Sequence, residues 1–353
     1  MNKIKIGNKI ISNDSPIFYI AEAGVNHNGS LKIAKKLVDI AKEAGADAVK
    51  FQSFLADEII IPKGPKAQYH IDTTGDDNKQ TWHELLKSQE ISKKMHQKII
   101  SYCNKKKIIF LSTPYDNISA DLLYKLKMPA YKIASTDNDN FPFIKFIASK
   151  KKPMIISTAM STIEDVEYLV KTLKKINFNK FALLQCTGNY PSKTEDSNLE
   201  VIKTYKEKFN CIVGLSDHTL DNIGCITAVG MGIKIIEKHF TLDKKLYGPD
   251  HRMSLTPKQL KTSIQEIRKA ELSLGSKYKV VLNSELANKK KLKKSLVTSN
   301  NFKKGHKINL ASIKIKRPGT GIRPKDLNKI LGLKINQDLK KDTVLKKSIF
   351  FKK

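Results

Sequence analysis

The sequence lacks the features that would place a protein outside the cell or in a membrane. Its 353 residues include only four cysteines, which lie far apart without the close pairs of zinc sites or small disulfide-linked domains. No apolar run reaches the roughly 18 residues that a membrane-spanning helix needs. The basic N-terminal segment also lacks the apolar stretch of a signal peptide. We therefore expect a cytoplasmic protein with no membrane partner.

Acidic residues are scarce as well, since 34 Asp and Glu stand against 65 Lys and Arg, for a net charge of +31. Such an excess is typical of proteins that bind nucleic acids or acidic surfaces. The lysines are spread over the whole chain, however, and no basic block is interleaved with aromatic residues. We therefore expect no nucleic-acid partner. The stretch from Lys291 onward, with 19 Lys and Arg against three Asp and Glu, forms a distinct unit in charge.

Short apolar segments recur through the first 240 residues. Their nearly continuous apolarity is typical of parallel strands that are covered on both faces. Segments with helical spacing separate them, such as the one that follows Ser30 and ends at Gly45. The predicted strands are residues 18–24, 48–54, 108–114, 130–135, 153–159, 181–187, 212–218 and 234–240. Eight strand–helix units in about 250 residues predict an α/β fold, a (β/α)8 TIM barrel, with residues 257–274 as the closing helix.

Each predicted strand ends in polar residues. In a barrel the carboxyl ends of all eight strands meet at one mouth, where the following loops build the active site. Because burying these groups without partners would be costly, we expect them to share a ligand. The residues are Glu22, Lys50, Gln52, Ser112, Thr113, Lys132, Ser135, Ser157, Thr158, Gln185, Thr187, Ser216, His218, Glu237 and His239.

Two lysines, Lys50 and Lys132, lie on strands with few other charges. Two ammonium groups among hydroxyl and backbone donors make an anion site, and phosphate is the anion that fits best. The alternative is that each lysine pairs with a carboxylate or extends toward solvent.

Two histidines, His218 and His239, end adjacent predicted strands. Because neighbouring strands lie about 4.8 Å apart, both imidazoles can reach one ion of the manganese or zinc type, with water or substrate as further ligands. The alternative is a pair of structural, hydrogen-bonded histidines. Asp217 and Glu237 would then support the ligands or cap helices.

An acidic residue, Glu22, could serve as a general base, or it could be a structural carboxylate paired with a lysine. Residues 250–252, Asp-His-Arg, could bind polyol hydroxyls, although the preceding Gly-Pro is also a turn signal. The residues alone indicate a metal-assisted reaction of a phosphorylated compound with a hydroxyl-rich partner. They leave an aldolase, a phosphatase and a synthase open.

Several motifs closely resemble the sialic acid synthase family. They include IAEAGVNHNGS from Ile20, FLSTPYD from Phe110, GLSDHT from Gly214, EKHFTLD from Glu237 and GPDHRMSL from Gly248. The stretch from Ser295 to Ile322 resembles the antifreeze-like SAF domain that closes these enzymes. The resemblance implies a catalytic TIM barrel over residues 1–275, a linker over 276–293 and a β-rich SAF domain over 294–353.

This resemblance implies a nonulosonic acid synthase, which condenses phosphoenolpyruvate with an N-acetylated aminosugar and releases phosphate with the help of Mn²⁺ or Mg²⁺. Its first candidate product is N-acetylneuraminate, made from N-acetylmannosamine. The alternative is N,N'-diacetyllegionaminate or pseudaminate, made from a diacetamido-trideoxy-hexose. The family likeness also implies a domain-swapped homodimer.

The resemblance assigns roles to particular positions. Glu22 matches the carboxylate beside the reacting aldehyde, and His218 and His239 match the metal ligands. Arg317 matches the arginine that the small domain delivers to the partner's active site. Ala159 and Gly188 depart from the usual family residues, which are Gly and Asn. Phosphoenolpyruvate is assigned to Lys50, Thr113, Lys132, Ser135, Ser157 and Ser216, and further substrate contacts to Gln52, Asp137, Tyr190 and Asp250.

Overall fold

The computed structural model describes residues 3–76 and 80–351. The chain divides into two compact units, which we call the barrel unit (residues 1–275) and the tail unit (residues 276–353). Among the described residues, no helix combines the length and the apolar character needed to cross a bilayer.

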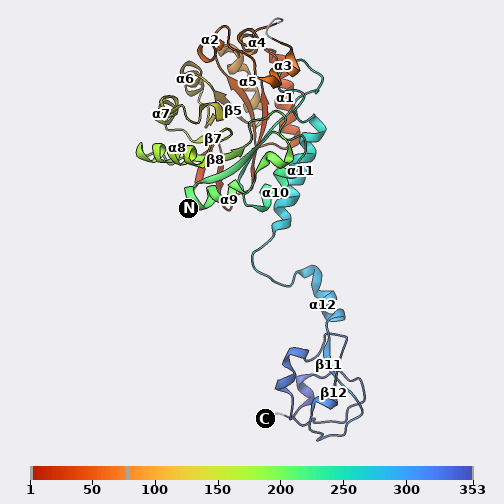
Figure 1. Cartoon of the computed structure of the whole chain (residues 1–353). Coiled ribbons are helices and arrows are strands. Elements are labelled where there is room, and N and C mark those ends of the chain that lie inside the picture. The colour runs from red at the N-terminus through yellow and green to blue at the C-terminus, as the bar shows by residue number, and fades with distance from the viewer. Residues whose placement is uncertain (1–2, 77–79, 352–353) are drawn as a thin grey trace. The chain divides into compact units, whose positions relative to one another are not determined.

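The barrel unit contains one eight-stranded parallel sheet, which confirms the predicted TIM-like fold (Figure 1). The strand order is β5-β4-β3-β10-β9-β8-β7-β6, and the end strands β5 and β6 lie next to each other, so the sheet is nearly closed. Every strand falls within its predicted range. The bounds are β3 (Phe18–Gly24), β4 (Ala48–Ser53), β5 (Ile109–Pro114), β6 (Tyr131–Ile133), β7 (Met154–Ser157), β8 (Phe181–Cys186), β9 (Ile212–Asp217) and β10 (Ile235–His239).

Helices alternate with these strands. The predicted ends of α1 are confirmed, because Ser30 Oγ accepts a hydrogen bond from Ile33 N and Gly45 takes a left-handed φ of 92°. The helices are α1 (Leu31–Ala44), α5 (Lys93–Lys106), α6 (Asn117–Lys125), α7 (Phe141–Ser149), α8 (Ile163–Lys175), α9 (Val201–Phe209), α10 (Ile223–Gly230) and the predicted closing helix α11 (Pro257–Leu274).

A segment of short helices precedes α5. It contains α2 (Ala56–Ile59), α3 (Gln68–Thr74) and α4 (Trp82–Gln89), which lie together at one end of the barrel unit (Figure 1). The sequence predicted no helix here. The segment is long for a connection between a strand and its helix, and such long connections often carry function.

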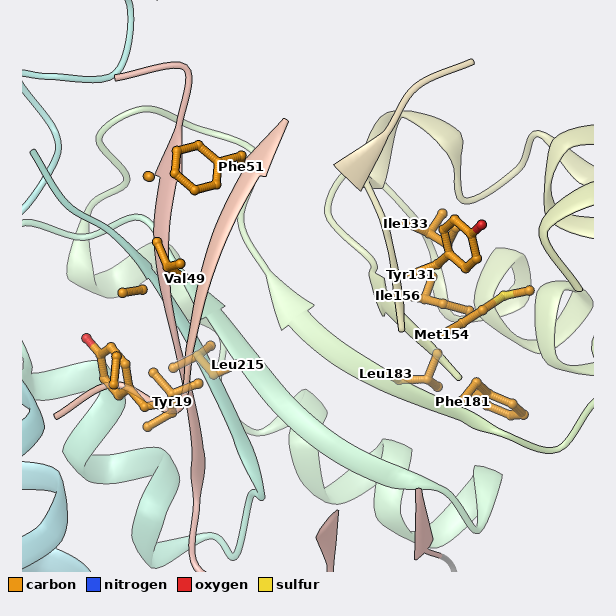
Figure 2. Close-up of a cluster of buried hydrophobic side chains, with 14 of the residues drawn as sticks. Tyr19, Val49, Phe51, Tyr131, Ile133, Met154, Ile156, Phe181, Leu183 and Leu215 are labelled. Atoms are coloured by element: carbon orange, nitrogen blue, oxygen red, sulfur yellow. The ribbon is translucent and has the colours of Figure 1, made fainter. Parts of the chain in front are cut away.

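Side chains alternate between the two faces of each strand, as the pleat requires. Outward-facing residues form the large core between sheet and helices, and Figure 2 shows part of it. Inward-facing residues at the starts of the strands, such as Phe18, Ile20 and Leu111, form a separate apolar layer inside the barrel. The outward residues labelled in Figure 2 are Tyr19, Val49, Phe51, Tyr131, Ile133, Met154, Ile156, Phe181, Leu183 and Leu215.

An N-terminal hairpin of β1 (Lys3–Ile6) and β2 (Lys9–Ser12) was not predicted. Its Ile4, Ile6 and Ile11 are buried in the same inner layer as Phe18. Because this layer lies at the starts of the strands, the hairpin closes the amino-terminal end of the barrel. The predicted site lies at the opposite end of the barrel, where the strands end in polar residues.

The tail unit is built around a small antiparallel pair, β11 (Ser295–Thr298) and β12 (Ile313–Lys316). Leu296, Ile308, Ile335 and Leu345 belong to its buried apolar core. The segment predicted as a linker contains α12 (Leu286–Leu292), and its residues are exposed.

Candidate active site

A ring of polar side chains lies directly above the inner apolar layer. These residues follow the apolar layer on the inward faces of the strands, and the ladders place Glu22 opposite Lys50 and Ser216 opposite Glu237. Their side chains are almost completely buried, Lys50 at 3% exposure and Lys132 at 4%. The ring comprises Glu22, Lys50, Thr113, Lys132, Ser157, Ser216 and Glu237.

Within this ring, two lysines and two carboxyl groups form one ion cluster. Lys50 Nζ lies 2.9 Å from Glu22 Oε2 and donates to Thr113 Oγ1 at 2.9 Å. Glu237 Oε1 lies 3.5 Å from Lys50 Nζ and 3.4 Å from Lys132 Nζ. Pairing of the lysines with carboxylates, which the sequence left open, therefore occurs. Glu237 is central to the cluster, whereas the sequence predicted only a supporting role for it.

The two carboxyl groups of the cluster differ in protonation. Burial raises the pKa of Glu22 to about 8 against the attraction of Lys50, and Glu237 adds to the rise. For Glu237 the effect of burial is outweighed by Lys132 and Lys50, which lower its pKa below the ordinary value. Glu22 is therefore a protonated acid near neutral pH beside an ionised carboxylate. Neighbouring carboxyl groups whose pKa values differ in this way are typical of sites that carry out acid–base catalysis.

The two predicted metal ligands lie together at the rim, with ring centroids 5.5 Å apart. His218 Nδ1 donates to Thr187 O at 2.7 Å, which leaves its Nε2 for a ligand. His239 Nδ1 is buried and has no hydrogen-bond partner among the described residues. Burial and the charge of His218 hold the pKa of His239 well below its usual value, so this imidazole is neutral. For His218 the effect of burial is outweighed by Cys186 and by the Thr187 carbonyl, which raise its pKa, so this second imidazole must lose a proton to bind a metal.

These imidazoles fit a metal site that is only partly made of protein. Among the described residues, no three His, Cys, Asp or Glu side chains are placed to hold a metal together. Asp250 Oδ2 lies 3.7 Å from His239 Nδ1, close to the pair. Two imidazoles would need oxygens from water or substrate to complete the coordination of a manganese-type ion.

Gly24 marks the point where three predicted side chains meet. A Cβ atom at this position would lie 3.2 Å from Asp250 Oδ2, 3.4 Å from Glu22 Oε1 and 3.5 Å from Gln52 Nε2. The φ of Gly24 is 51°, in the left-handed region that favours glycine. Glycine thus both permits this backbone conformation and leaves space among the three polar groups.

Other predicted residues occupy the edges of this site. The ring of Tyr190 packs against that of His218, with centroids 4.2 Å apart and planes tilted by 32°. Ser135 Oγ accepts a hydrogen bond from Ala159 N at 3.0 Å, and Asp137 accepts one from Asn140 Nδ2 at 3.0 Å.

Arg317 belongs to the tail unit. Its side chain is exposed, and its Nε donates to Leu292 O at 3.1 Å. Its predicted role in a partner's active site stays a prediction.

Some polar residues do not face the mouth as expected. His251 is bonded to Thr241 Oγ1 at 2.6 Å and Arg252 to Asp72 O at 3.1 Å, so protein groups occupy both. Ser112, Thr158 and Gln185 point outward and hydrogen-bond to Phe51 O, Leu184 O and Ser197 O respectively. Adjacent residues on a strand face opposite ways, so two consecutive polar residues cannot both line the interior.

The two unusual positions, Ala159 and Gly188, pack against each other. A Cβ atom on Gly188 would lie 3.4 Å from Ala159 Cβ and 3.1 Å from Met160 Cγ. A larger side chain at 188 would therefore crowd Ala159 and Met160, and the two departures from the family pattern are complementary in packing.

A second buried ion pair lies on the outer face, behind the histidines. Lys238 Nζ donates to the Asp217 carboxylate and, at 2.9 Å, to Thr219 O. Asp217 also accepts from Thr219 N at 2.9 Å and from Cys225 Sγ at 3.2 Å. The pair joins β9 to β10 at the positions next to His218 and His239, so it fixes the spacing of the two imidazoles. Lys238 was not among the residues predicted to matter.

We predict that Lys238→Met destabilises the protein by about 3–5 kcal/mol, because it leaves the Asp217 charge buried without a partner. The double variant Asp217→Asn/Lys238→Met should recover much of this loss. Denaturant unfolding of the single and double variants measures both effects. As a control, Lys303→Met, in a pair whose lysine is 92% exposed, should unfold like the wild type. If the wild type and Lys238→Met have the same free energy of unfolding, the Lys238–Asp217 pair does not stabilise the contact between β9 and β10.

A pH prediction follows from Glu22, whose pKa is raised from 4.5 to about 8 in the folded chain. The folded protein binds a proton that the unfolded chain releases, so this contribution to stability is complete below pH 4.5 and is lost as the pH rises through 8. Glu22→Gln cannot lose that proton. In metal-free protein its melting temperature should therefore fall less between about pH 6 and 9 than that of the wild type. Parallel curves for the two proteins would show that Glu22 does not titrate there.

Comparison with known proteins finds a family match for each of the two units. Residues 37–279 match the NeuB family and residues 293–349 match the SAF domain. The N,N'-diacetyllegionaminic acid synthase of Legionella pneumophila is 41% identical over 93% of each chain. The mouse N-acetylneuraminate-9-phosphate synthase is 34% identical over 95% of this chain and 93% of that protein.

A solved structure is similar as well. It is that of the N-acetylneuraminic acid (sialic acid) synthetase from Leptospira borgpetersenii in complex with citrate. It superposes with a TM-score of 0.72 and 32% identity, over 81% of this chain and 95% of that one.

Proposed function

The chain belongs to the NeuB family and is an acid synthase, and we propose that it condenses phosphoenolpyruvate with an open-chain N-acetylated aminosugar. The observation that carries this proposal is the pair of buried ammonium groups, Lys50 and Lys132, in the same barrel mouth as Ser157 Oγ and His239 Nδ1. These last two atoms are buried and have no hydrogen-bond partner among the described residues. Together they offer an anion site and a cation site within one mouth.

The proposed reaction joins C3 of phosphoenolpyruvate to the aldehyde carbon of the sugar. Water adds to C2, and the C–O bond to phosphate then breaks, so the products are a nine-carbon 2-keto acid and inorganic phosphate. Lys50, Lys132 and Ser157, with the hydroxyls of Thr113, Ser135 and Ser216, hold the anionic groups of phosphoenolpyruvate. Fixed charges and orientation supply most of the catalysis in such a site.

Glu22 supplies the proton in this scheme. Its raised pKa keeps it protonated near neutral pH, so it can donate to the aldehyde oxygen as the new carbon–carbon bond forms. A divalent cation, Mn²⁺ or Mg²⁺, held by His218 and His239 would polarise the same oxygen as a Lewis acid. Gln52, Asp137, Tyr190 and Asp250 contact the sugar.

For the acceptor, we propose a diacetamido-trideoxy-hexose, with N,N'-diacetyllegionaminate as the product. The support is the likeness to the N,N'-diacetyllegionaminic acid synthase of Legionella pneumophila, whose identity to this chain, 41%, exceeds the 34% of the mouse enzyme. This reverses the order of the two candidates that the sequence alone indicated. N-acetylmannosamine, which would give N-acetylneuraminate, is the second candidate.

The assembly we propose is a domain-swapped homodimer in the cytoplasm. In it, Arg317 of each tail unit would reach the barrel mouth of the other subunit. The support is the SAF match over residues 293–349 and the exposed guanidinium of Arg317.

The reaction is tested by incubating the protein with phosphoenolpyruvate, each aminosugar and Mn²⁺ or Mg²⁺, and measuring phosphate and product mass. We expect phosphate release only with acceptor and metal both present. Lys50→Met should lower the rate by about a thousandfold, because it removes a buried charge from the anion site. Lys203→Met, at a surface lysine, should leave the rate unchanged. No phosphate release with either sugar would refute the proposed function.

The swapped arrangement is tested by subunit complementation. Arg317→Ala and His218→Ala should each be inactive as homodimers. If the arginine acts across the dimer, co-expression restores one complete site in each mixed dimer, or about a quarter of wild-type activity for random pairing. If instead the arginine serves its own barrel, no mixed dimer has a complete site and no activity returns.

A further inference from the structure

Three tyrosines at the barrel mouth differ from the other partly or fully buried tyrosines. The hydroxyls of Tyr69, Tyr115 and Tyr190 have no hydrogen-bond partner among the described residues, although all three side chains are half-buried. Tyr131, on the outer face of β6, and Tyr205, on α9, instead donate to Ala120 O and Thr158 Oγ1. The three hydroxyls are not among the fully buried atoms without a partner, so water reaches them. They are therefore available to hydrogen-bond to a ligand that replaces this water.

Two of these tyrosines extend the histidine pair into an aromatic wall. The ring of Tyr190 packs against that of His218 at 4.2 Å with a tilt of 32°. Tyr69 stacks on Tyr190 at 4.9 Å with an interplanar angle of 28°. Tyr69 comes from α3, in the segment between β4 and α5. Tyr190 thus lies between the histidine pair and Tyr69, so Tyr69 is the ring farthest from the histidines. Because the aldehyde reacts at the histidines, Tyr69 faces the distal carbons of a bound sugar.

The third tyrosine, Tyr115, lies nearer the reacting end. Its ring packs edge-on against Phe54 at 6.1 Å. Burial and the charge of Glu22 raise the pKa of Tyr115 well above its usual value. Burial and Asp250 raise the pKa of Tyr69 as well. Both phenols are therefore donors at neutral pH.

The chemistry of the wall favours an amide over a polyol. An aromatic face packs against methyl groups and C–H bonds, and a phenol donates to a carbonyl oxygen. An acetamido group offers both a methyl and a carbonyl. A chain of hydroxyls pressed against the same rings would lose water without equal compensation.

We propose that Tyr69 is a specificity-determining residue that binds the second acetamido group and the terminal methyl group of the acceptor. The inference rests on the proposed function and deepens it. It assigns discrimination between a diacetamido-trideoxy-hexose and N-acetylmannosamine to the α3 segment, because the two sugars differ only at the distal carbons.

The test compares kcat/KM for the two acceptors in the wild type, Tyr69→Phe, Tyr69→Leu and the control Tyr205→Phe, whose hydroxyl bonds outside the mouth. The wild type should prefer the diacetamido sugar. Tyr69→Leu should lower that preference by about tenfold and Tyr69→Phe by less, through the KM of this acceptor. The KM of phosphoenolpyruvate and the preference of Tyr205→Phe should not change.

Different outcomes separate the two proposals. A wild type that releases no phosphate with either acceptor overturns the proposed function. A wild type that turns over but prefers N-acetylmannosamine overturns the proposed acceptor and the inference about Tyr69, and it leaves the proposed condensation in place. An unchanged preference in Tyr69→Phe and Tyr69→Leu also overturns it. If Tyr69→Leu fails to fold, Tyr69→Phe, which loses one oxygen atom, decides the matter.

Discussion

The four ionisable groups buried in the barrel constrain the rest of the structure. Lys50, Lys132, Glu22 and Glu237 are each at most 4% exposed, and burial of an unpaired charge is costly. They are tolerable because both lysines lie within 3.5 Å of the ionised Glu237 carboxylate. Such a cluster contributes little to stability compared with a packed apolar core. Its presence is better explained by a ligand whose own charges pair with the lysines.

The remaining architecture isolates this cluster. The inner apolar layer and the β1–β2 hairpin close the barrel beneath it. On the outer face, the Lys238–Asp217 pair joins the strands that carry His218 and His239. The two faces of β9 and β10 thus differ, with buried polar groups of the candidate site inside and a structural ion pair outside. This division explains why both strands end in several polar residues in a row, which is unusual for buried parallel strands.

Much of this arrangement could be predicted from the sequence, because it depends on local periodicity. Apolar runs gave the strands within a residue or two, and their polar ends located the mouth. The alternation of side chains along a strand would have separated inward from outward residues. Glu237 lies two residues before His239 and so faces inward with it, whereas Ser112 and Thr158 lie at positions that face outward. The hairpin has a local signal that was overlooked, because two short strand-like runs flank the two-residue turn Gly7-Asn8. The α3 segment was missed because its packing partners are distant in the sequence. The stack of Tyr69 on Tyr190 joins positions that no local pattern relates.

The central claim is that Lys50 and Lys132 bind one anionic substrate inside the barrel. A crystal structure of the protein with phosphoenolpyruvate tests it most directly. The account predicts that phosphate or carboxylate oxygens lie within hydrogen-bond distance of both Nζ atoms. Phosphoenolpyruvate bound elsewhere, with both lysines still paired only to Glu22 and Glu237, would contradict it.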